Sequence, residues 1–252
     1  EDPIVKAFAA VSMLVTLVVT TVIGVRMLLV ARKTRQLPEL LFGIAFLFGG
    51  GGQGFMLMGQ RMIWTEPGLI ATTMNALLYG LVILGNVGLY VVVWRVFQPS
   101  ARGAGVAAVG TMALLVGYGM RLGAGEFADG ETFGNGMRVI LAARISLFCW
   151  IAMEAFHHAS QLARRARLGL ADALAALQIR LWGVTGAANM LLTVMVAWYT
   201  MELRRSPLDD FWSLCGILAA VAISSTSMWV AFFPPAGLAA RVRAQGDASS
   251  TA

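Results

Sequence analysis

The sequence predicts an all-α integral membrane protein, a bundle of seven transmembrane helices. Hydrophobic residues make up 58% of the 252 residues and charged residues only 13%, whereas soluble domains average about 45–50% and about 25%. The apolar residues also fall in blocks of roughly 20, the length at which a helix crosses a bilayer core of about 30 Å. This composition excludes a soluble domain, which could not bury so large an apolar excess.

Seven apolar blocks define the predicted spans. In chain order they cover residues 4–30, 39–60, 68–97, 104–122, 137–163, 173–201 and 209–233. The first six are followed by the polar segments "ARKTRQLPE", "RMIWTEPG", "FQPSARGAG", "GAGEFADGETFGNG", "ARRARLGLAD" and "ELRRSPLDD". The last block ends at "FFPPAG", whose prolines cannot continue the helix. We therefore expect one transmembrane domain, residues 1–237, and a short disordered cytoplasmic tail, residues 238–252.

Basic residues set the predicted orientation, because short loops rich in Lys and Arg stay in the cytoplasm. The first, third and fifth loops and the tail hold Arg32, Lys33, Arg35, Arg95, Arg102, Arg164, Arg165, Arg167, Arg241 and Arg243. The opposite side gathers Glu1, Asp2, Glu66, Glu126, Asp129, Glu131, Glu202, Asp209 and Asp210. The sequence therefore predicts an N-terminus outside and a C-terminus in the cytoplasm.

The net charge of +6 does not indicate a nucleic-acid partner, because its basic residues lie in turns between apolar blocks. We expect these turns to contact membrane lipids instead. Abundant glycine and alanine with almost no lysine favours a bacterial source, and hence the bacterial cytoplasmic (inner) membrane.

The predicted topology resembles that of rhodopsins and seven-helix receptors, but in topology alone. A retinal Schiff base needs a lysine in the last helix, and the only lysines are Lys6 and Lys33. The third span also lacks a carboxylate that could act as counter-ion. We therefore expect no covalently bound retinal and no other cofactor, with a noncovalent pigment or lipid as an open alternative.

Arg144 is the residue that most needs an explanation. It lies roughly 12 Å below the outer surface in an apolar helix, too deep for its charge to reach water easily. Residues at similar predicted depth outline an outward-facing vestibule: Gln53, Asn75, Tyr118, Arg121, Tyr199, Asp209 and Asp210. Because a guanidinium suits a carboxylate or phosphate, the vestibule predicts a site for a small anionic or lipidic ligand. The alternative is an internal pair of Arg144 with Asp209 or Asp210.

A second polar group occupies "WIAMEAFHHASQLARRAR", at the cytoplasmic end of the fifth predicted span. It contains Glu154, His157 and His158, and the depth along the next span places Arg180 level with them. One interpretation is a structural clasp in which Arg180 pairs with Glu154 and a histidine supports the carboxylate. The alternative is a pH-sensitive latch, since histidine titrates near physiological pH.

The second span contains the run Gly49, Gly50, Gly51 and Gly52. Small residues allow membrane helices to approach closely, which is one interpretation of this run. Consecutive glycines also weaken a helix, so a kink or a short non-helical segment is the other.

The sequence lacks the patterns of nucleophiles, metal ligands or phosphate loops that mark enzymes, so we expect neither an enzyme nor a metal site. Two classes remain. The first is a receptor- or sensor-like membrane protein that binds a ligand from the outer side and signals through a membrane or cytoplasmic protein partner. The second is a structural or accessory subunit of a larger membrane complex. We favour the first, and a transporter or a pigment-binding protein is a further alternative.

Overall fold

The computed structural model describes residues 3–62, 68–127, 134–203 and 211–250, and these residues form helices without any strand. The elements are α1 (Pro3–Thr34), α2 (Leu37–Ile44), η1 (Ala45–Gly51), α3 (Gly52–Met62), α4 (Leu69–Val96), α5 (Ala101–Gly123), α6 (Asn135–Arg167), α7 (Ala173–Met201), α8 (Phe211–Phe232) and α9 (Ala236–Ser250). The prediction of an all-α fold is confirmed for the described part of the chain.

Within the described residues, six helices are long and apolar enough to cross a membrane. They are α1 over Leu14–Thr34, α4, α5, α6, α7 and α8, with mean hydropathy between 1.4 and 2.3. Each coincides with a predicted span. Their length and composition indicate a helical membrane protein, and this part of the fold prediction is confirmed.

The second predicted span, residues 39–60, is divided among three elements. α2, η1 and α3 follow one another without a break from Leu37 to Met62, and η1 is a π-helix. A π-helix joins each amide to the carbonyl five residues earlier, and it is wider than an α-helix. The glycine run therefore remains helical but changes its helical type. No single one of these three elements reaches the length of a membrane-spanning helix.

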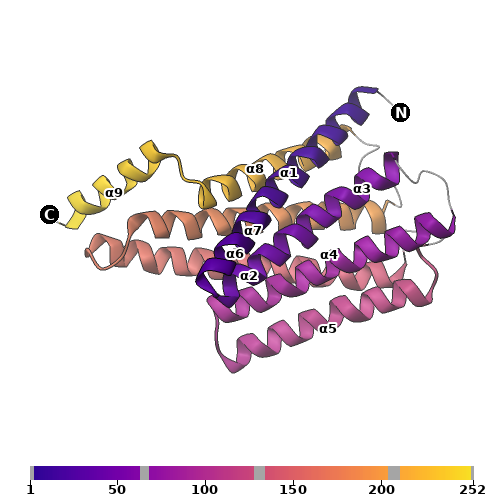
Figure 1. The fold of residues 1–252 in the computed structure, drawn as a ribbon, viewed down its shortest axis with the longest axis horizontal. Coiled ribbons are helices and arrows are strands. Elements are labelled where there is room, and N and C mark those ends of the chain that lie inside the picture. Colours follow the sequence, from indigo (N-terminus) through magenta and orange to yellow (C-terminus); the bar gives the residue numbers. More distant parts are fainter. Residues whose placement is uncertain (1–2, 63–67, 128–133, 204–210, 251–252) are drawn as a thin grey trace.

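The contacts between the helices follow a ring. α1 packs against the α2–η1–α3 segment, which packs against α4, and the order continues through α5, α6, α7 and α8. Contact between α8 and α1 closes the ring, and α4 also touches α6 across it. In Figure 1, α5 lies along one edge of the bundle and α9 extends beyond one end.

Glycines allow η1 to lie very close to α4. A Cβ atom added to Gly85 of α4 would lie 2.2 Å from the backbone nitrogen of Gly49. On the other side of η1, a Cβ added to Gly50 would lie 2.4 Å from Cγ2 of Thr20 in α1. The glycine run thus packs closely on two helices, because its missing side chains leave room for both neighbours.

The packing of α4, α5 and α6 is centred on Tyr90, which is 1% exposed. Its hydroxyl lies 2.7 Å from both the carbonyl oxygen of Ala143 and Oγ of Ser146 on α6. Its ring covers Gly110 of α5, where an added Cβ would lie 2.1 Å from the ring. A bulky aromatic residue on α4 therefore requires a glycine on α5 at this level.

A second cluster joins η1, α7 and α8 through aromatic rings. The ring of Trp182 lies 5.9 Å from that of Phe46 and 5.8 Å from that of Phe232. Phe46 and Phe232 are 5.7 Å apart, and all three pairs meet edge to face. Each such pair contributes about 0.5–1.5 kcal/mol beyond the area that it buries.

Polar side chains join α7 to α8 at several levels. Asn189 donates to Oγ of Ser224 at 2.8 Å, and Gln178 donates to the carbonyl oxygen of Ala231 at 2.9 Å. Hydrogen bonds of this kind between membrane helices contribute about 0.6 kcal/mol each on average.

The chain after α8 differs from the prediction of a disordered tail, residues 238–252. After Pro234 and Pro235 it forms α9, and the amide of Ala239 donates to the carbonyl oxygen of Pro235 at 3.0 Å. Proline is favourable at the start of a helix, and alanine and arginine, which are frequent here, favour a helix. α9 packs near α6 and α7.

We expect Gly85→Ala to destabilise the bundle by about 1–3 kcal/mol, because its Cβ must push against the Gly49 backbone rather than against a flexible side chain. Thermal unfolding in detergent measures the change. Gly105→Ala on α5 is the matched control, since an added Cβ there meets nothing within 4 Å. Equal melting temperatures for the two variants would contradict the close packing of η1 on α4.

Candidate functional site

Arg144 lies on α6, partly buried in the bundle and facing α3. Its Nη2 donates to Oε1 of Gln53 at 3.0 Å, and its guanidinium lies 5.9 Å from the ring of Phe148. Its Nε is buried and has no hydrogen-bond partner. Among the described residues, the positive charge therefore has a neutral amide as its hydrogen-bond partner and no carboxylate within 4 Å.

The structure brings together two of the predicted vestibule residues, Arg144 and Gln53. Asp209 and Asp210, the predicted acidic partners, lie outside the described residues. Asn75 on α4 and Tyr199 on α7 are partly buried. Within the described part of the chain, the hydrogen bond that Arg144 donates to Gln53 is the contact that joins Arg144 to another predicted site residue.

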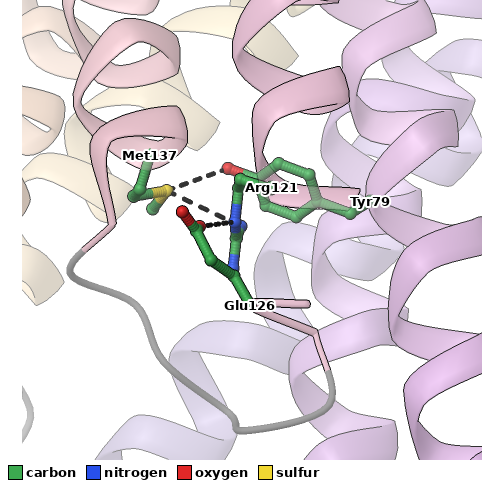
Figure 2. Close-up of polar contacts among 4 residues, drawn as sticks. All are labelled: Tyr79, Arg121, Glu126 and Met137. Atoms are coloured by element: carbon green, nitrogen blue, oxygen red, sulfur yellow. Dashed lines mark hydrogen bonds and ion pairs between the residues drawn. The ribbon is translucent and has the colours of Figure 1, made fainter. Parts of the chain in front are cut away.

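Arg121, at the end of α5, lies in a buried cluster of its own (Figure 2). Its Nε is 2.9 Å from Oε2 of Glu126, and both side chains are less than a tenth exposed. The guanidinium also lies over the rings of Tyr79 and Phe127, at 4.6 and 4.5 Å from their centres. The charge of Arg121 is thus paired and covered by aromatic rings.

Met137 of α6 completes this cluster. The Tyr79 hydroxyl donates to its sulfur atom at 3.2 Å, and Nη1 of Arg121 approaches the same sulfur at 3.7 Å. In Figure 2, the dashed lines from the two donors meet at the sulfur. The cluster therefore joins α4 to the end of α5 and the start of α6.

The role of Glu126 was missed in the sequence, where it was assigned to an acidic outer loop. Gly125 has φ of 70°, a conformation that glycine adopts at little cost, and it turns the chain back over the end of α5. The amide of Glu126 then donates to the carbonyl oxygen of Arg121 at 3.1 Å, and its side chain reaches the guanidinium. The signal that could have revealed this pair is a glycine beyond the helix end, followed by a glutamate.

A cavity of about 340 Å³ lies between α4 and α5 beside this cluster. It is lined by Thr72, Thr73, Ala76, Leu77, Tyr118, Leu122, Gly125 and Phe127. Tyr118, a predicted site residue, donates from its hydroxyl to the carbonyl oxygen of Ala76 at 2.9 Å. Phe127 belongs both to the cavity wall and to the Arg121 cluster. The lining is mainly apolar with a few hydroxyl groups, as in pockets for small amphiphilic molecules.

The predicted clasp has a different partner in the structure. Oε2 of Glu154 lies 3.8 Å from Nε2 of His158, one helical turn away on α6. Nε2 of His158 is also 2.9 Å from the carbonyl oxygen of Phe97. Because a carbonyl oxygen only accepts, Nε2 donates this hydrogen bond and carries a proton. His158 therefore links the C-terminal part of α6 to the end of α4.

The other two members of the predicted clasp lie apart from Glu154. Arg180 is exposed on α7 and, within the described residues, forms no ion pair with Glu154. His157 is exposed, and its Nε2 lies 2.8 Å from Nε2 of Gln161. Equal depth along two helices does not make two side chains face each other. Here His158, one turn away on α6, contacts Glu154 in place of Arg180 on α7.

The comparisons with known proteins give no match: no protein-family model, no curated protein and no solved structure resembles the chain.

We expect the Arg121–Glu126 pair to show strong coupling in a double-mutant cycle. Arg121→Gln and Glu126→Gln should each destabilise the protein by about 3–5 kcal/mol, since each leaves one buried charge without its partner. The double variant should lose clearly less than the sum of the two. Chemical or thermal unfolding in detergent provides the measurement, with Arg138→Gln, an exposed arginine of α6, as control. Additive losses would exclude a direct pair.

Proposed function

We propose that the protein is a receptor- or sensor-like membrane protein that binds a small anionic or lipidic ligand from its outer side. The observation that carries this proposal is the incomplete pairing of Arg144, whose guanidinium meets the amide of Gln53 and leaves a buried Nε without a partner. An arginine inside a membrane protein is costly, and it normally faces a partner or a functional site.

A bound anion would complete the hydrogen bonding of Arg144. A buried donor without a partner costs about 1–3 kcal/mol, which a ligand oxygen would recover. Carboxylate and phosphate groups accept two parallel hydrogen bonds from a guanidinium, an arrangement that the amide of Gln53 satisfies only in part. The ligand class that fits is therefore a carboxylate or a phosphate ester.

Arg121 is less suited to this role, although it lies at the same end of the bundle. Its charge is paired with Glu126, and its faces are covered by Tyr79 and Phe127. A ligand anion at Arg121 would have to displace a buried carboxylate. The cavity between α4 and α5 is lined by neither Arg144 nor Gln53, so the proposal does not rest on it.

We further propose that the second apolar segment crosses the membrane as one path through α2, η1 and α3, which gives seven spans. Support comes from the ring of helices, in which this segment occupies one complete position between α1 and α4. The basic loops favour an outer N-terminus and a cytoplasmic C-terminus in a bacterial inner membrane. A signal would then pass to a separate protein partner at the cytoplasmic turns, and the protein itself would not be an enzyme.

We expect wild-type protein purified gently from its membrane to retain an anionic molecule that native mass spectrometry detects. Arg144→Gln should lose this mass, whereas Arg138→Gln, which removes an exposed arginine from the same helix, should keep it. With added probes, a fatty acid should raise the melting temperature of the wild type more than the alcohol of equal chain length. Arg144→Gln should abolish that difference.

The opposite results also have definite meanings. A fatty acid that stabilises Arg144→Gln as well as the wild type would contradict the proposed role of Arg144. Loss of folding in Arg144→Gln, with a folded Arg144→Lys, would show that the charge is structural. A defined complex with another membrane protein and no bound small molecule would favour an accessory subunit.

The seven-span topology has its own test in a variant that lacks Cys149 and Cys215. A cysteine at Gly68, which is exposed with nothing within 4 Å of its added Cβ, should react with a membrane-impermeant maleimide in intact cells. A cysteine at the exposed Lys33, which lies before the α2–η1–α3 segment, should react only after lysis. The reversed pattern would overturn the orientation, and equal reactivity from one side would exclude an odd number of crossings between Lys33 and Gly68.

A further inference from the structure

A groove of about 370 Å³ lies at the turn between α1 and α2. Its lining residues are Leu28, Ala31, Arg32, Arg35, Gln36, Leu37 and Leu40. The apolar residues come from the end of the first membrane-spanning helix and from α2. Of the two cationic residues, Arg32 lies in the last turn of α1 and Arg35 in the connection between the helices. The groove therefore has an apolar wall that continues the membrane-facing surface and a cationic rim where that surface ends.

Both arginines of the rim are available to a ligand. Arg32 and Arg35 are exposed, and neither side chain has a hydrogen bond or ion pair to another described residue. The lining contains no carboxylate. Glu39 in the first turn of α2 is outside the lining, and its Oε2 is buried without a hydrogen-bond partner. Two positive charges thus face the groove without an acidic residue to neutralise them.

The backbone conformation of Arg35 is one that glycine would adopt with less strain than arginine. Arg35 has φ of 56°, the left-handed conformation in which glycine is the favoured residue. Its amide donates to the carbonyl oxygen of Ala31 at 2.8 Å and so ends α1. A helix end in this conformation is usually glycine, and here it carries a guanidinium on the rim of the groove.

We propose that this groove binds an anionic phospholipid, with the phosphate group at Arg32 and Arg35 and part of an acyl chain along Leu28, Leu37 and Leu40. A guanidinium donates two parallel hydrogen bonds to a phosphate, and basic pockets between membrane helices on the cytoplasmic side are a general means of holding anionic head groups. A lipid fits better than a soluble protein, because the apolar wall continues a membrane-spanning helix and is open to acyl chains.

This proposal goes beyond the outer site and is independent of it. The groove involves residues of α1 and α2, and Arg144 and its contacts belong to α6 and α3. A variant in the groove therefore leaves the outer ligand unaffected, and the failure of one proposal is distinguishable from the failure of the other.

The test is native mass spectrometry of the full chain in detergent, titrated with phosphatidylglycerol or with phosphatidylcholine of the same acyl chains. The wild type should prefer phosphatidylglycerol, and the double variant Arg32→Gln/Arg35→Gln should bind it roughly 30-fold more weakly, as expected for the loss of two cationic side chains beside an anionic head group. The double variant Arg164→Gln/Arg165→Gln is the matched control, because it removes two exposed arginines from another basic turn. Its affinity should change by less than about threefold, since these residues do not line the groove.

Several outcomes would overturn the proposal. They are equal binding of the two lipids by the wild type, equal losses in the two double variants, and displacement of the lipid by inorganic phosphate alone. Retention of the lipid by Arg32→Gln/Arg35→Gln would also overturn it. A soluble protein would then be the better candidate for binding at this turn. If that variant does not fold, a photoactivatable phosphatidylglycerol on the wild type decides: labelling within residues 28–40 supports the groove, and labelling elsewhere alone overturns it.

Discussion

The backbone contact between Gly49 of η1 and Gly85 of α4 constrains much of the remaining structure. Membrane helices gain little from the hydrophobic effect once they are in lipid, so close packing and polar contacts must hold them together. The approach at these glycines brings η1 against α4 while α1 covers its other side. Gln53 follows η1 almost directly, and a π-turn rotates every later side chain relative to an unbroken α-helix. The position of Gln53 opposite Arg144 therefore depends on this contact.

Arg121, Arg144 and Arg35 have three different environments for a positive charge. Arg121 has a buried carboxylate and aromatic rings around it, so that its charge is neutralised inside the fold. Arg144 has the neutral amide of Gln53 and a buried Nε without a hydrogen-bond partner, so that its charge is not neutralised by a described side chain. Arg35 stays at the rim of the bundle, where solvent and lipid head groups are within reach. The partners within reach of each guanidinium thus distinguish Arg121 from Arg144 and Arg35.

Hydropathy predicted the six long apolar helices well, because the hydropathy of a segment depends on the depth of its residues along the helix axis, which is a single coordinate. α7 and α8 begin and end within two residues of their predicted limits. Depth says nothing about rotation around the helix axis. The sequence could therefore predict that Arg180 is level with Glu154, but not that the two side chains form no ion pair among the described residues. The pairing of Arg144 with Gln53 was within reach of the sequence, since both residues were assigned to one vestibule. The π-helix was not, because its form depends on the surfaces of α1 and α4 that enclose it.

The polar contacts of α7 also affect how the chain enters the membrane during synthesis. α7 has the lowest mean hydropathy of the six apolar helices, 1.4 against 2.3 for α1. Part of its polarity is Asn189, whose partner Ser224 lies on α8 and is synthesised later. α7 must therefore enter lipid while this amide still lacks its partner across the helix interface, a state that favours retention beside the insertion machinery or insertion as a hairpin with α6. The turn from Leu168 to Asp172 is short enough for such a hairpin. Assembly of this half of the bundle is then completed only when α8 arrives.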